Sequence, residues 1–295
     1  MEIFLTGATG YIGSAVREAL QKAGHKVTGL ARTAEKAKQL ESRGARASLG
    51  DLLEPETLMA PARAAGGVIH TANTNDANSA KADRAGVRAI LNALEGTGKP
   101  FIYTSGVWVL GSTGDKIADE QAPLNPATLV AQRPAVEQEV LGYQGRGVRT
   151  IVIRPALVYG RGGSIPKMLV QSARESGATR YVGGGQNRWP FVDVDDLAEL
   201  YVLALERAAA GSLYHAAHGP SYRVLEVAEA ASMGGGANGR TQAVPLDEAR
   251  KTMGAFADAL ILDQQVSGEK AKKELAWSPR AASVLDDLKT GSYTR

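Results

Sequence analysis

One stretch near the start of the chain decides its fold: Ile3-Phe4-Leu5-Thr6-Gly7-Ala8-Thr9-Gly10-Tyr11-Ile12-Gly13. It reads as a short apolar strand, a turn with glycine at every third position, and the first turn of an amphipathic helix. In such a turn the first glycine permits the bend, the second lets backbone approach a diphosphate, and the third lets helix pack on strand. The open helix N-terminus adds free N–H groups and a positive dipole end. The stretch therefore predicts a unit that binds a dinucleotide.

Apolar runs alternate with helical patterns through the first half of the chain. Strands are expected at residues 3–6, 26–31, 45–49, 67–71, 101–105 and 148–154, and helices at 11–23, 34–42, from about 55, 80–95 and 128–141. Strands separated by helices of this length form βαβ units. The run Thr150-Ile151-Val152-Ile153 is typical of a strand buried on both faces. We therefore predict an α/β protein with a Rossmann-type doubly wound parallel sheet.

The pattern changes after about residue 160, where glycine-rich breaks appear at residues 161–163, 183–185 and 234–236. Beyond them we expect a strong helix at 193–209 and strands at 212–216 and 241–244 among short helices. We predict a dinucleotide-binding core of residues 1–160 and a smaller mixed C-terminal substrate lobe of residues 161–295. Residues 179–216 are expected to return partly to the core.

Composition excludes several classes of site. The chain has no cysteine, which rules out disulfides and thiolate catalysis, and its four histidines are too scattered to suggest a metal site. The net charge of +3 comes from scattered Lys and Arg, so a nucleic-acid partner is not expected. We find no signal peptide and no apolar run long enough for a membrane helix, so we expect no membrane contact and a cytoplasmic location.

The end of the second predicted strand favours NADP(H). The chain reads Gly29-Leu30-Ala31-Arg32 there, without the carboxylate that would accept a hydrogen bond from the ribose 2′-hydroxyl of NAD. Arg32 is suited to a bidentate contact with the 2′-phosphate of NADP, and Lys36 adds a second positive charge nearby. NAD(H) is the less favoured alternative.

Residues 6–13 resemble the extended short-chain dehydrogenase/reductase superfamily, which includes NAD(P)-dependent epimerase/dehydratase-like proteins. Residues 50–52 resemble the segment that lies against the adenine, 70–73 the fourth-strand end that passes the cofactor, and 101–106 the fifth strand with its catalytic Ser or Thr. Residues 154–160, 185–198 and 276–279 resemble downstream segments of the same proteins.

The resemblance, together with the glycine turn and the basic strand end, implies a set of cofactor-binding residues. These are Gly7, Thr9, Gly10, Tyr11, Ile12, Gly13, Arg32, Lys36, Asp51, Leu52, Thr71, Ala72, Asn73, Thr104, Arg133, Pro155, Leu157 and Val158.

The catalytic motif departs from the family pattern. The superfamily carries Tyr-x-x-x-Lys, with a Glu four residues beyond the Lys. Aligned on Glu137, the Tyr position holds Leu129 and the Lys position holds Arg133. Leucine cannot transfer a proton, and arginine keeps a fixed positive charge because its pKa exceeds about 12. The chain is therefore expected to be an atypical member of the superfamily.

Other residues are candidates for the missing chemistry. Ser105, Tyr159 and Arg133 are the predicted catalytic residues, and Trp108, Tyr159 and Trp189 are the predicted substrate pocket. Each aromatic residue has an alternative reading as part of the apolar core. Asp193, Asp195 and Asp196 are interpreted as a helix cap rather than a catalytic or metal cluster.

Three functions remain open at this stage. The favoured one is an NADP(H)-dependent oxidoreductase that reduces a small carbonyl, imine or activated C=C substrate with a non-standard proton donor. The second is a non-catalytic NADP(H)-binding redox sensor, and the third a sugar-nucleotide epimerase or dehydratase. A homodimer formed through helices outside the sheet is possible.

Overall fold

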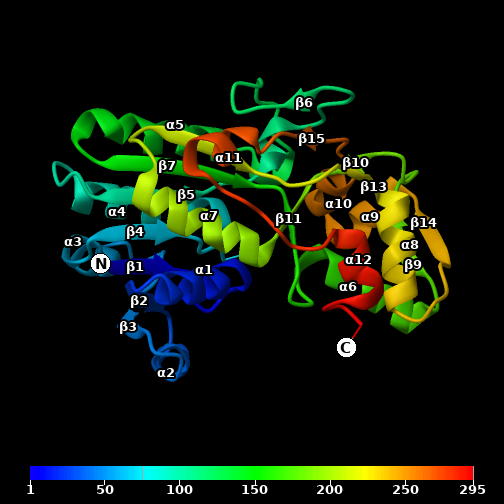
Figure 1. Ribbon diagram of the computed structural model, residues 1–295, viewed down its shortest axis with the longest axis horizontal. Coiled ribbons are helices and arrows are strands. Elements are labelled where there is room, and N and C mark those ends of the chain that lie inside the picture. Colours follow the sequence, from blue (N-terminus) through cyan, green and yellow to red (C-terminus); the bar gives the residue numbers. More distant parts are fainter. Residues whose placement is uncertain (75, 295) are drawn as a thin grey trace.

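The structure, a computed structural model, describes residues 1–74 and 76–294. At its centre lies a seven-stranded sheet in the order β12-β7-β5-β4-β1-β2-β3 (Figure 1). The strands are β1 (Glu2–Thr6), β2 (Lys26–Ala31), β3 (Arg46–Leu49), β4 (Gly67–His70), β5 (Pro100–Thr104), β7 (Arg149–Pro155) and β12 (Ser212–Ala216). Every neighbouring pair is parallel. The predicted α/β class and doubly wound sheet are therefore confirmed.

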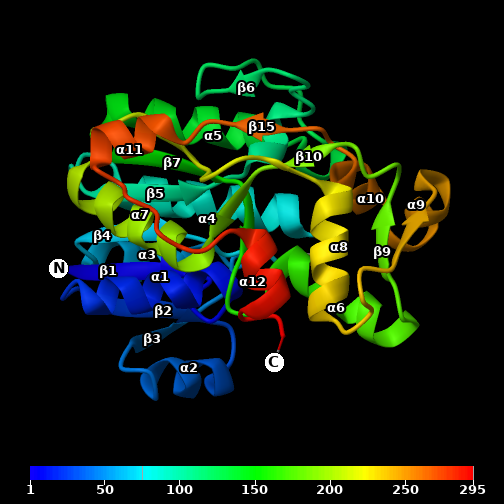
Figure 2. The ribbon, with the colours of Figure 1, turned by 45° about the vertical axis from the view of Figure 1, so that its right-hand side comes forward.

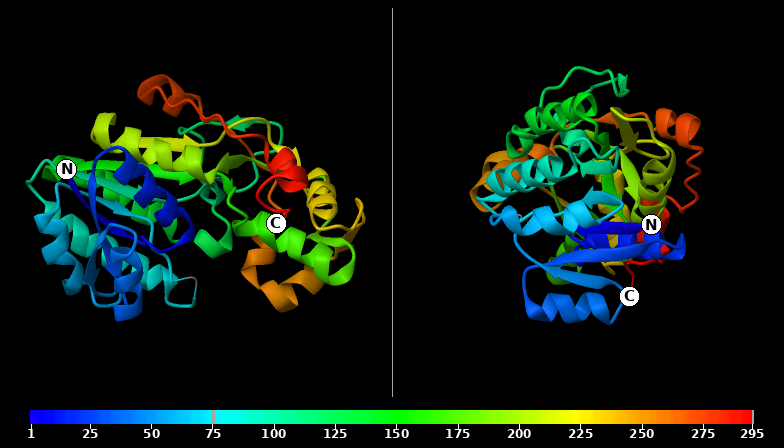
Figure 3. Two further views of the ribbon diagram at one scale, coloured as in Figure 1. Left: turned by 60° about the horizontal axis from the view of Figure 1, so that its bottom comes forward. Right: turned by 90° about the vertical axis from the view of Figure 1, so that its left-hand side faces the viewer.

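Helices cover both faces of this sheet, as the end-on view in Figure 3 shows. α1 (Tyr11–Lys22) and α7 (Val194–Arg207) pack on one face, and α11 (Glu269–Leu275) lies beside α7. The other face is covered by α3 (Glu56–Ala64), α4 (Ser79–Leu94) and α5 (Arg133–Gly142). α2 (Ala34–Glu41) packs on β3 at the sheet edge. Burial on both faces explains the apolar run of β7, in which residues 150–153 are fully buried.

The helix predicted at residues 128–141 is divided in two. Thr128–Val130 forms a 3₁₀ turn, and α5 begins only at Arg133. Pro134 explains the late start, because proline has no N–H to donate and is tolerated in the first turn of a helix but not in its interior. Two further 3₁₀ turns, Val107–Leu110 and Tyr143–Arg146, follow β5 and α5.

A mixed lobe lies beyond the carboxyl ends of the sheet strands (Figure 2). Its helices are α6 (Ser164–Ser176), α8 (Val224–Gly234), α9 (Leu246–Met253), α10 (Ala255–Leu260) and α12 (Val284–Thr290). Its strand pairs are β8 (Leu157–Tyr159) with β11 (Phe191–Asp193), β9 (Thr179–Val182) with β14 (Thr241–Val244), and β10 (Arg188–Trp189) with β13 (Tyr222–Arg223). A fourth pair, β6 (Ile117–Ala118) with β15 (Gln265–Val266), projects from the sheet domain.

The lobe has an apolar core of its own, which includes Phe191, Val227 and Leu288. The chain leaves this core through α7 and β12 and then returns to it. The domain boundary at residue 160 stays a prediction.

The start of α7 is fixed by the predicted cap. The Asp193 carboxylate accepts hydrogen bonds from the backbone N–H groups of Asp195 (2.7 Å) and Asp196 (3.3 Å). The Asp196 carboxylate in turn accepts from the backbone of Arg280 and Ala281, which ties the C-terminal segment to α7. Asp193 therefore caps α7 as predicted, whereas Asp195 pairs with the Arg161 side chain and Asp196 holds the C-terminal segment.

Within the described ranges, no helix combines the length and the apolar character that crossing a bilayer requires.

A buried ion pair joins β7 to α5. The Arg154 Nε and Nη2 atoms donate to the two oxygens of Glu137 at 3.0 and 2.5 Å, and both side chains are 3% exposed. His215 on β12 packs beside this pair, with its Nε2 3.3 Å from Arg154 Nη1. Burial, followed by the charge of Arg154, lowers the pKa of His215 to about 3. The imidazole is therefore neutral in the folded protein at neutral pH.

This histidine should make the protein acid-sensitive. An unfolded histidine binds its proton near pH 6.5, so between about pH 6.5 and 3 the unfolded chain holds more protons than the folded one. Stability is therefore lost as the pH falls through this window. We expect His215→Gln, which keeps an acceptor near Arg154, to flatten that loss by up to about 1.4 kcal/mol per pH unit. Urea unfolding at several pH values would check this, and parallel curves for both proteins would contradict it.

Candidate functional site

The glycine turn between β1 and α1 is closed by very tight packing. Gly7 has a φ of +74°, and the N–H of Gly10 donates to its carbonyl at 2.8 Å. A Cβ on Gly13 would lie 2.1 Å from the Gly7 oxygen, and one on Gly7 would lie 2.7 Å from Thr71 Oγ1. No described side chain caps α1. The first N–H groups of this helix therefore face the cleft without a protein acceptor, as anion binding requires.

A cleft of about 550 Å³ runs from this turn along the carboxyl ends of β1, β2, β4 and β5. Most of the predicted cofactor residues line it: Gly7, Thr9, Gly10, Tyr11, Ile12, Gly13, Arg32, Lys36, Asp51, Leu52, Thr71, Ala72, Asn73, Thr104 and Arg133. Leu30, Ala31, Thr74 and Ser105 line it as well. The turn and the basic strand end therefore open into one cleft, although they are separated in the sequence.

A second cavity, of about 750 Å³, continues from the cleft toward the C-terminal lobe. The two share Ile12, Asn73, Ser105 and Arg133 in their linings. Pro155, Leu157 and Val158, predicted to contact the cofactor, line this second cavity instead of the cleft. Trp108 lines it too, as predicted for a substrate pocket. We call the two spaces the cleft and the cavity, and the four shared residues the junction.

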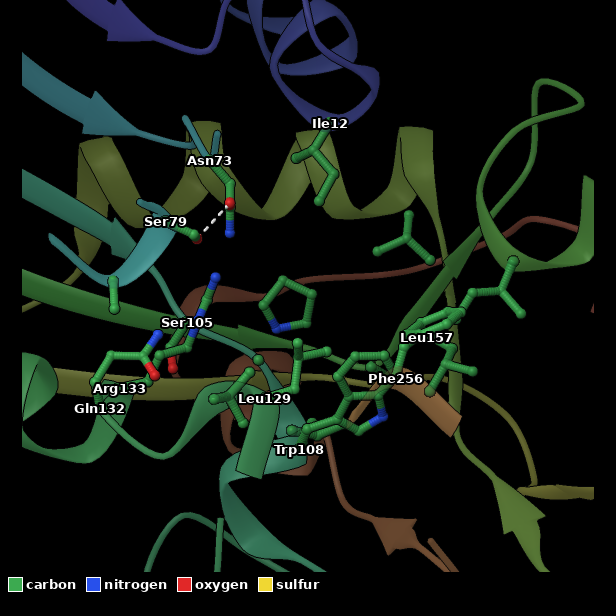
Figure 4. A pocket seen from close by; sticks show the side chains of 18 of the residues that line it. Ile12, Asn73, Ser79, Ser105, Trp108, Leu129, Gln132, Arg133, Leu157 and Phe256 are labelled. Carbon is green, nitrogen blue, oxygen red and sulfur yellow. Dashed lines mark hydrogen bonds between the residues drawn. The ribbon is translucent and has the colours of Figure 1, made fainter. Parts of the chain in front are cut away.

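The polar and apolar side chains of the cavity lie at different ends (Figure 4). Asn73, Ser79, Ser105, Gln132 and Arg133 gather at the junction end, where Ser79 Oγ donates to Asn73 Oδ1 at 2.7 Å. The other end presents apolar side chains, chiefly Trp108, Leu157 and Phe256, and Leu129 lies between the two groups.

Ser105 places a buried hydroxyl at the junction. Its backbone N–H donates to the Ile153 carbonyl at 2.8 Å, which fixes the residue at the end of β5. The side chain is buried, the residue being 5% exposed, and its Oγ has no hydrogen-bond partner among the described residues. A buried hydroxyl without a partner is costly, so this hydroxyl is placed to bond a ligand at the junction.

Arg133 supplies the positive charge of the junction. It begins α5, and its Nη1 donates to the Thr104 carbonyl at 3.1 Å. The Thr104 hydroxyl is bonded in turn to the hydroxyl of the buried Tyr201, at 2.6 Å. Leu129, in the 3₁₀ turn that precedes α5, lines the cavity, and no tyrosine lies among the described residues that line it. The junction therefore holds a fixed cation and a hydroxyl, without a phenol.

A buried polar chain links β1, β4, α4 and β5, and sequence reasoning missed it. His70 Nδ1 is 2.9 Å from Thr6 Oγ1, His70 Nε2 is 3.2 Å from Asp83 Oδ1, and the Tyr103 hydroxyl donates to Asp83 Oδ2 at 2.7 Å. Burial alone would raise the pKa of Asp83, but the hydrogen bond and charge of His70, with the charge of Arg133, hold it below its usual range. In the sequence, the only signal for this polar chain is the acidic residue Asp83 on the apolar face of α4.

The structure corrects two predictions for the substrate pocket. The Tyr159 hydroxyl, predicted to be catalytic, donates to the Ala282 carbonyl at 2.5 Å, and its ring packs edge-on against Phe191. Trp189 is 3% exposed, and its Nε1 donates to the Leu260 carbonyl at 3.0 Å. Neither lines the cavity, because both belong to the apolar core of the lobe.

The apolar wall includes a residue that the sequence did not suggest. Phe256 comes from α10, far along the chain, and packs edge-on against Trp108 with ring centroids 6.0 Å apart. It has no motif around it, so only the packing of α10 against the 3₁₀ turn at Thr128–Val130 brings it to the cavity.

The glycine turn allows a matched test of ligand binding against folding. A Cβ on Gly10 meets only the Gly7 oxygen, at 3.1 Å, so Gly10→Ala should fold but obstruct the approach of a diphosphate. We expect its Kd for dinucleotide to rise at least about tenfold, with Tm within about 2 °C of the wild type. Gly13→Ala, where the Cβ would overlap the Gly7 carbonyl, should instead lower Tm by several degrees. Calorimetry and thermal melting separate these effects; unchanged binding by Gly10→Ala would contradict the assignment.

Comparison with known proteins places these features in context. The sequence model of the NAD dependent epimerase/dehydratase family matches residues 3–217. An uncharacterized protein of Saccharomyces cerevisiae is 34% identical over 297 residues, covering 98% of both chains. The 4-hydroxy-2-methyl-3-oxo-4-farnesyl-3,4-dihydroquinoline-1-oxide ketoreductase of Stigmatella aurantiaca is 30% identical over 227 residues, or 72% of this chain and 67% of its own.

The fold has close counterparts among solved structures. A dTDP-glucose 4,6-dehydratase of Streptomyces venezuelae, a double mutant with NAD bound, superposes with a TM-score of 0.84. The match covers 99% of this chain and 96% of the other at 19% identity, so it bears on the fold alone.

Proposed function

Since this chain belongs to the NAD dependent epimerase/dehydratase family, we propose that it is an oxidoreductase that uses NADP(H) to reduce a small carbonyl, imine or activated C=C substrate. The observation that carries the proposal is the junction, where a cleft suited to a dinucleotide meets a cavity beside an unpartnered hydroxyl and a fixed cation. The ketoreductase of Stigmatella aurantiaca supports a reductase over an epimerase.

The residues of the cleft fit a nicotinamide dinucleotide. The uncapped N-terminus of α1 suits the diphosphate, and the lining of the cleft includes both Arg32 and Ser105. When bound there, NADPH supplies a hydride to the substrate. All remaining chemistry must come from the chain or from water.

The junction residues can stabilise the charge that develops on the substrate. Ser105 Oγ–H would donate to the substrate oxygen or nitrogen, and the Arg133 guanidinium would add a fixed positive charge. Arg133 does not release a proton near neutral pH, and Leu129 has none to give. The proton that completes reduction of a carbonyl or imine is therefore assigned to water entering from the cavity. An activated C=C bond makes a smaller demand, because its enolate needs only a hydrogen-bond donor at first.

Arg32 and Lys36 support NADP(H) over NAD(H). Both side chains are exposed at the far end of the cleft, and neither forms an ion pair with a described residue. Lys36 Nζ donates only to Gln39, at 3.2 Å. Two cations around one position can form charge-assisted hydrogen bonds with a 2′-phosphate. They add little binding free energy for a neutral 2′-hydroxyl.

Arg32 provides the test of cofactor choice. Arg32→Ala should weaken NADP⁺ binding about ten- to a hundredfold, since a hydrogen bond to a charged group contributes roughly 1.5–3 kcal/mol. NAD⁺ binding should stay unchanged. Lys38→Ala is the matched control, because Lys38 is exposed on α2, which follows Arg32 directly, but does not line the cleft. Calorimetric titration with both cofactors measures the difference, and an equal effect on NAD⁺ would overturn the NADP(H) assignment.

Ser105 provides the test of the reaction. NADPH consumption would be followed by absorbance across panels of carbonyls, imines and enones. For any substrate reduced, we expect Ser105→Ala to lower kcat about a hundredfold, the usual effect of losing one oxyanion donor. Its NADPH affinity should be retained.

Full activity of Ser105→Ala would remove Ser105 from the mechanism. Tight NADPH binding with no turnover on any panel would favour the redox sensor, because Leu129 stands at the cavity where a proton donor is expected.

A further inference from the structure

We propose that the substrate is an uncharged ketone with an extended apolar chain, not a sugar nucleotide. This inference rests on the proposed reductase function and adds the class of compound on which it acts. The evidence is the distribution of charge and apolar surface along the cavity, which the folds of the two lobes bring together.

The apolar wall is assembled from separate segments. Trp108 comes from the 3₁₀ turn after β5, Leu129 from the 3₁₀ turn before α5, and Phe256 from α10. Leu157 on β8 and Ile165 on α6 extend the wall toward the lobe. Side chains from five elements thus converge on one space, which is the arrangement of a binding site and not of a single exposed helix face.

Most of the apolar side chains of this wall remain partly exposed to solvent. Leu129 is 42% exposed, and Trp108, Ile165 and Phe256 are only half-buried although they adjoin well-packed cores. Each apolar group of a ligand that covers such surface gains free energy in proportion to the area removed from water. The wall therefore favours a ligand with an apolar body.

The wall is also held in place before any ligand binds. The end of α10 is fixed by Asn187, whose Nδ2 donates to the carbonyls of Leu260 and Leu262 at 3.0 and 3.1 Å. Trp189 Nε1 donates to the same Leu260 carbonyl. Phe256 therefore lies on a helix that is already fixed by hydrogen bonds. Ligand binding should thus lose little conformational entropy at this position.

The charges of the cavity argue against a second diphosphate. Among the described residues that line it, Arg133 is the single cation, and it also belongs to the cleft. Asp76 adds a carboxylate, held by hydrogen bonds from Thr74 Oγ1 and the Asn78 N–H, both at 2.8 Å. A sugar nucleotide would bring a diphosphate to a cavity whose single cation is shared with the cleft and offset by one carboxylate, so the diphosphate would lack a charged partner there.

The arrangement also sets the direction of the substrate. The hydrogen-bonding groups lie at the junction end, so the carbonyl points to Ser105 and the chain runs toward Phe256. Within about 750 Å³ there is room for a body much larger than butanone.

The experiment is a kinetic series with NADPH and butanone, octanone and dodecanone, with UDP-glucose as competitor. We expect kcat/KM to rise about threefold for each methylene added until the wall is covered, and UDP-glucose not to inhibit. Phe256→Ala should lower kcat/KM for octanone about tenfold or more and leave butanone nearly unchanged. Met253→Ala is the matched control, because Met253 is 40% exposed on neighbouring α9 but does not line the cavity.

Turnover of butanone and octanone with equal kcat/KM, or inhibition by UDP-glucose that is competitive with the ketone at saturating NADPH, would overturn the substrate class while leaving the reductase intact. If none of the ketones is reduced, calorimetric binding to the NADP⁺-loaded protein decides the point. Octanone binding weakened by Phe256→Ala would then support the apolar site although the reductase proposal had failed. Binding of UDP-glucose, or failure of every ketone to bind, would reject the proposed substrate class.

Discussion

The whole site depends on the contact between the Gly7 carbonyl and the Cα of Gly13. It presses the N-terminus of α1 against the end of β1, and Thr71 and Ala72 at the end of β4 close over the same turn. Any side chain at Gly13 would force helix and strand apart. Without that closure the first amides of α1 would no longer converge on one point, and the cleft would lose its anion site. The geometry of cofactor binding is therefore set by backbone packing rather than by a particular side chain.

The same turn also connects the two lobes. The Tyr11 hydroxyl donates to the Gly160 carbonyl at 2.8 Å, and the Gly160 N–H donates to the hydroxyl of Tyr293. Tyr293 OH donates onward to the Gly163 carbonyl at 2.9 Å, so the end of the chain holds the loop on which Tyr11 rests. Ile12, the next residue, belongs to the junction. The position of the C-terminal lobe is thus linked to the glycine turn through hydrogen bonds that lie next to a junction residue.

The features that could be predicted from the sequence are those whose pattern lies within a short segment. The sheet and the glycine turn were predicted because their patterns are contained in short segments, and β2 and β12 begin and end where the pattern places them. Tyr159 and Trp189 were misplaced because their partners, Ala282 and Leu260, lie 123 and 71 residues away. Aromatic residues give no local sign of which way they face. Phe256 and Asp83 were missed for the same reason, since only tertiary packing brings Phe256 to the cavity and Asp83 to His70.

We place the nicotinamide at the junction, between the cleft and the cavity. A crystal structure of the chain with NADP⁺ would test this placement. We expect the diphosphate on the N–H groups of Tyr11 and Ile12, and the nicotinamide ring between Ser105 and Arg133 with one face open to the cavity. A dinucleotide bound elsewhere, or a nicotinamide turned away from Ser105 into solvent, would contradict it.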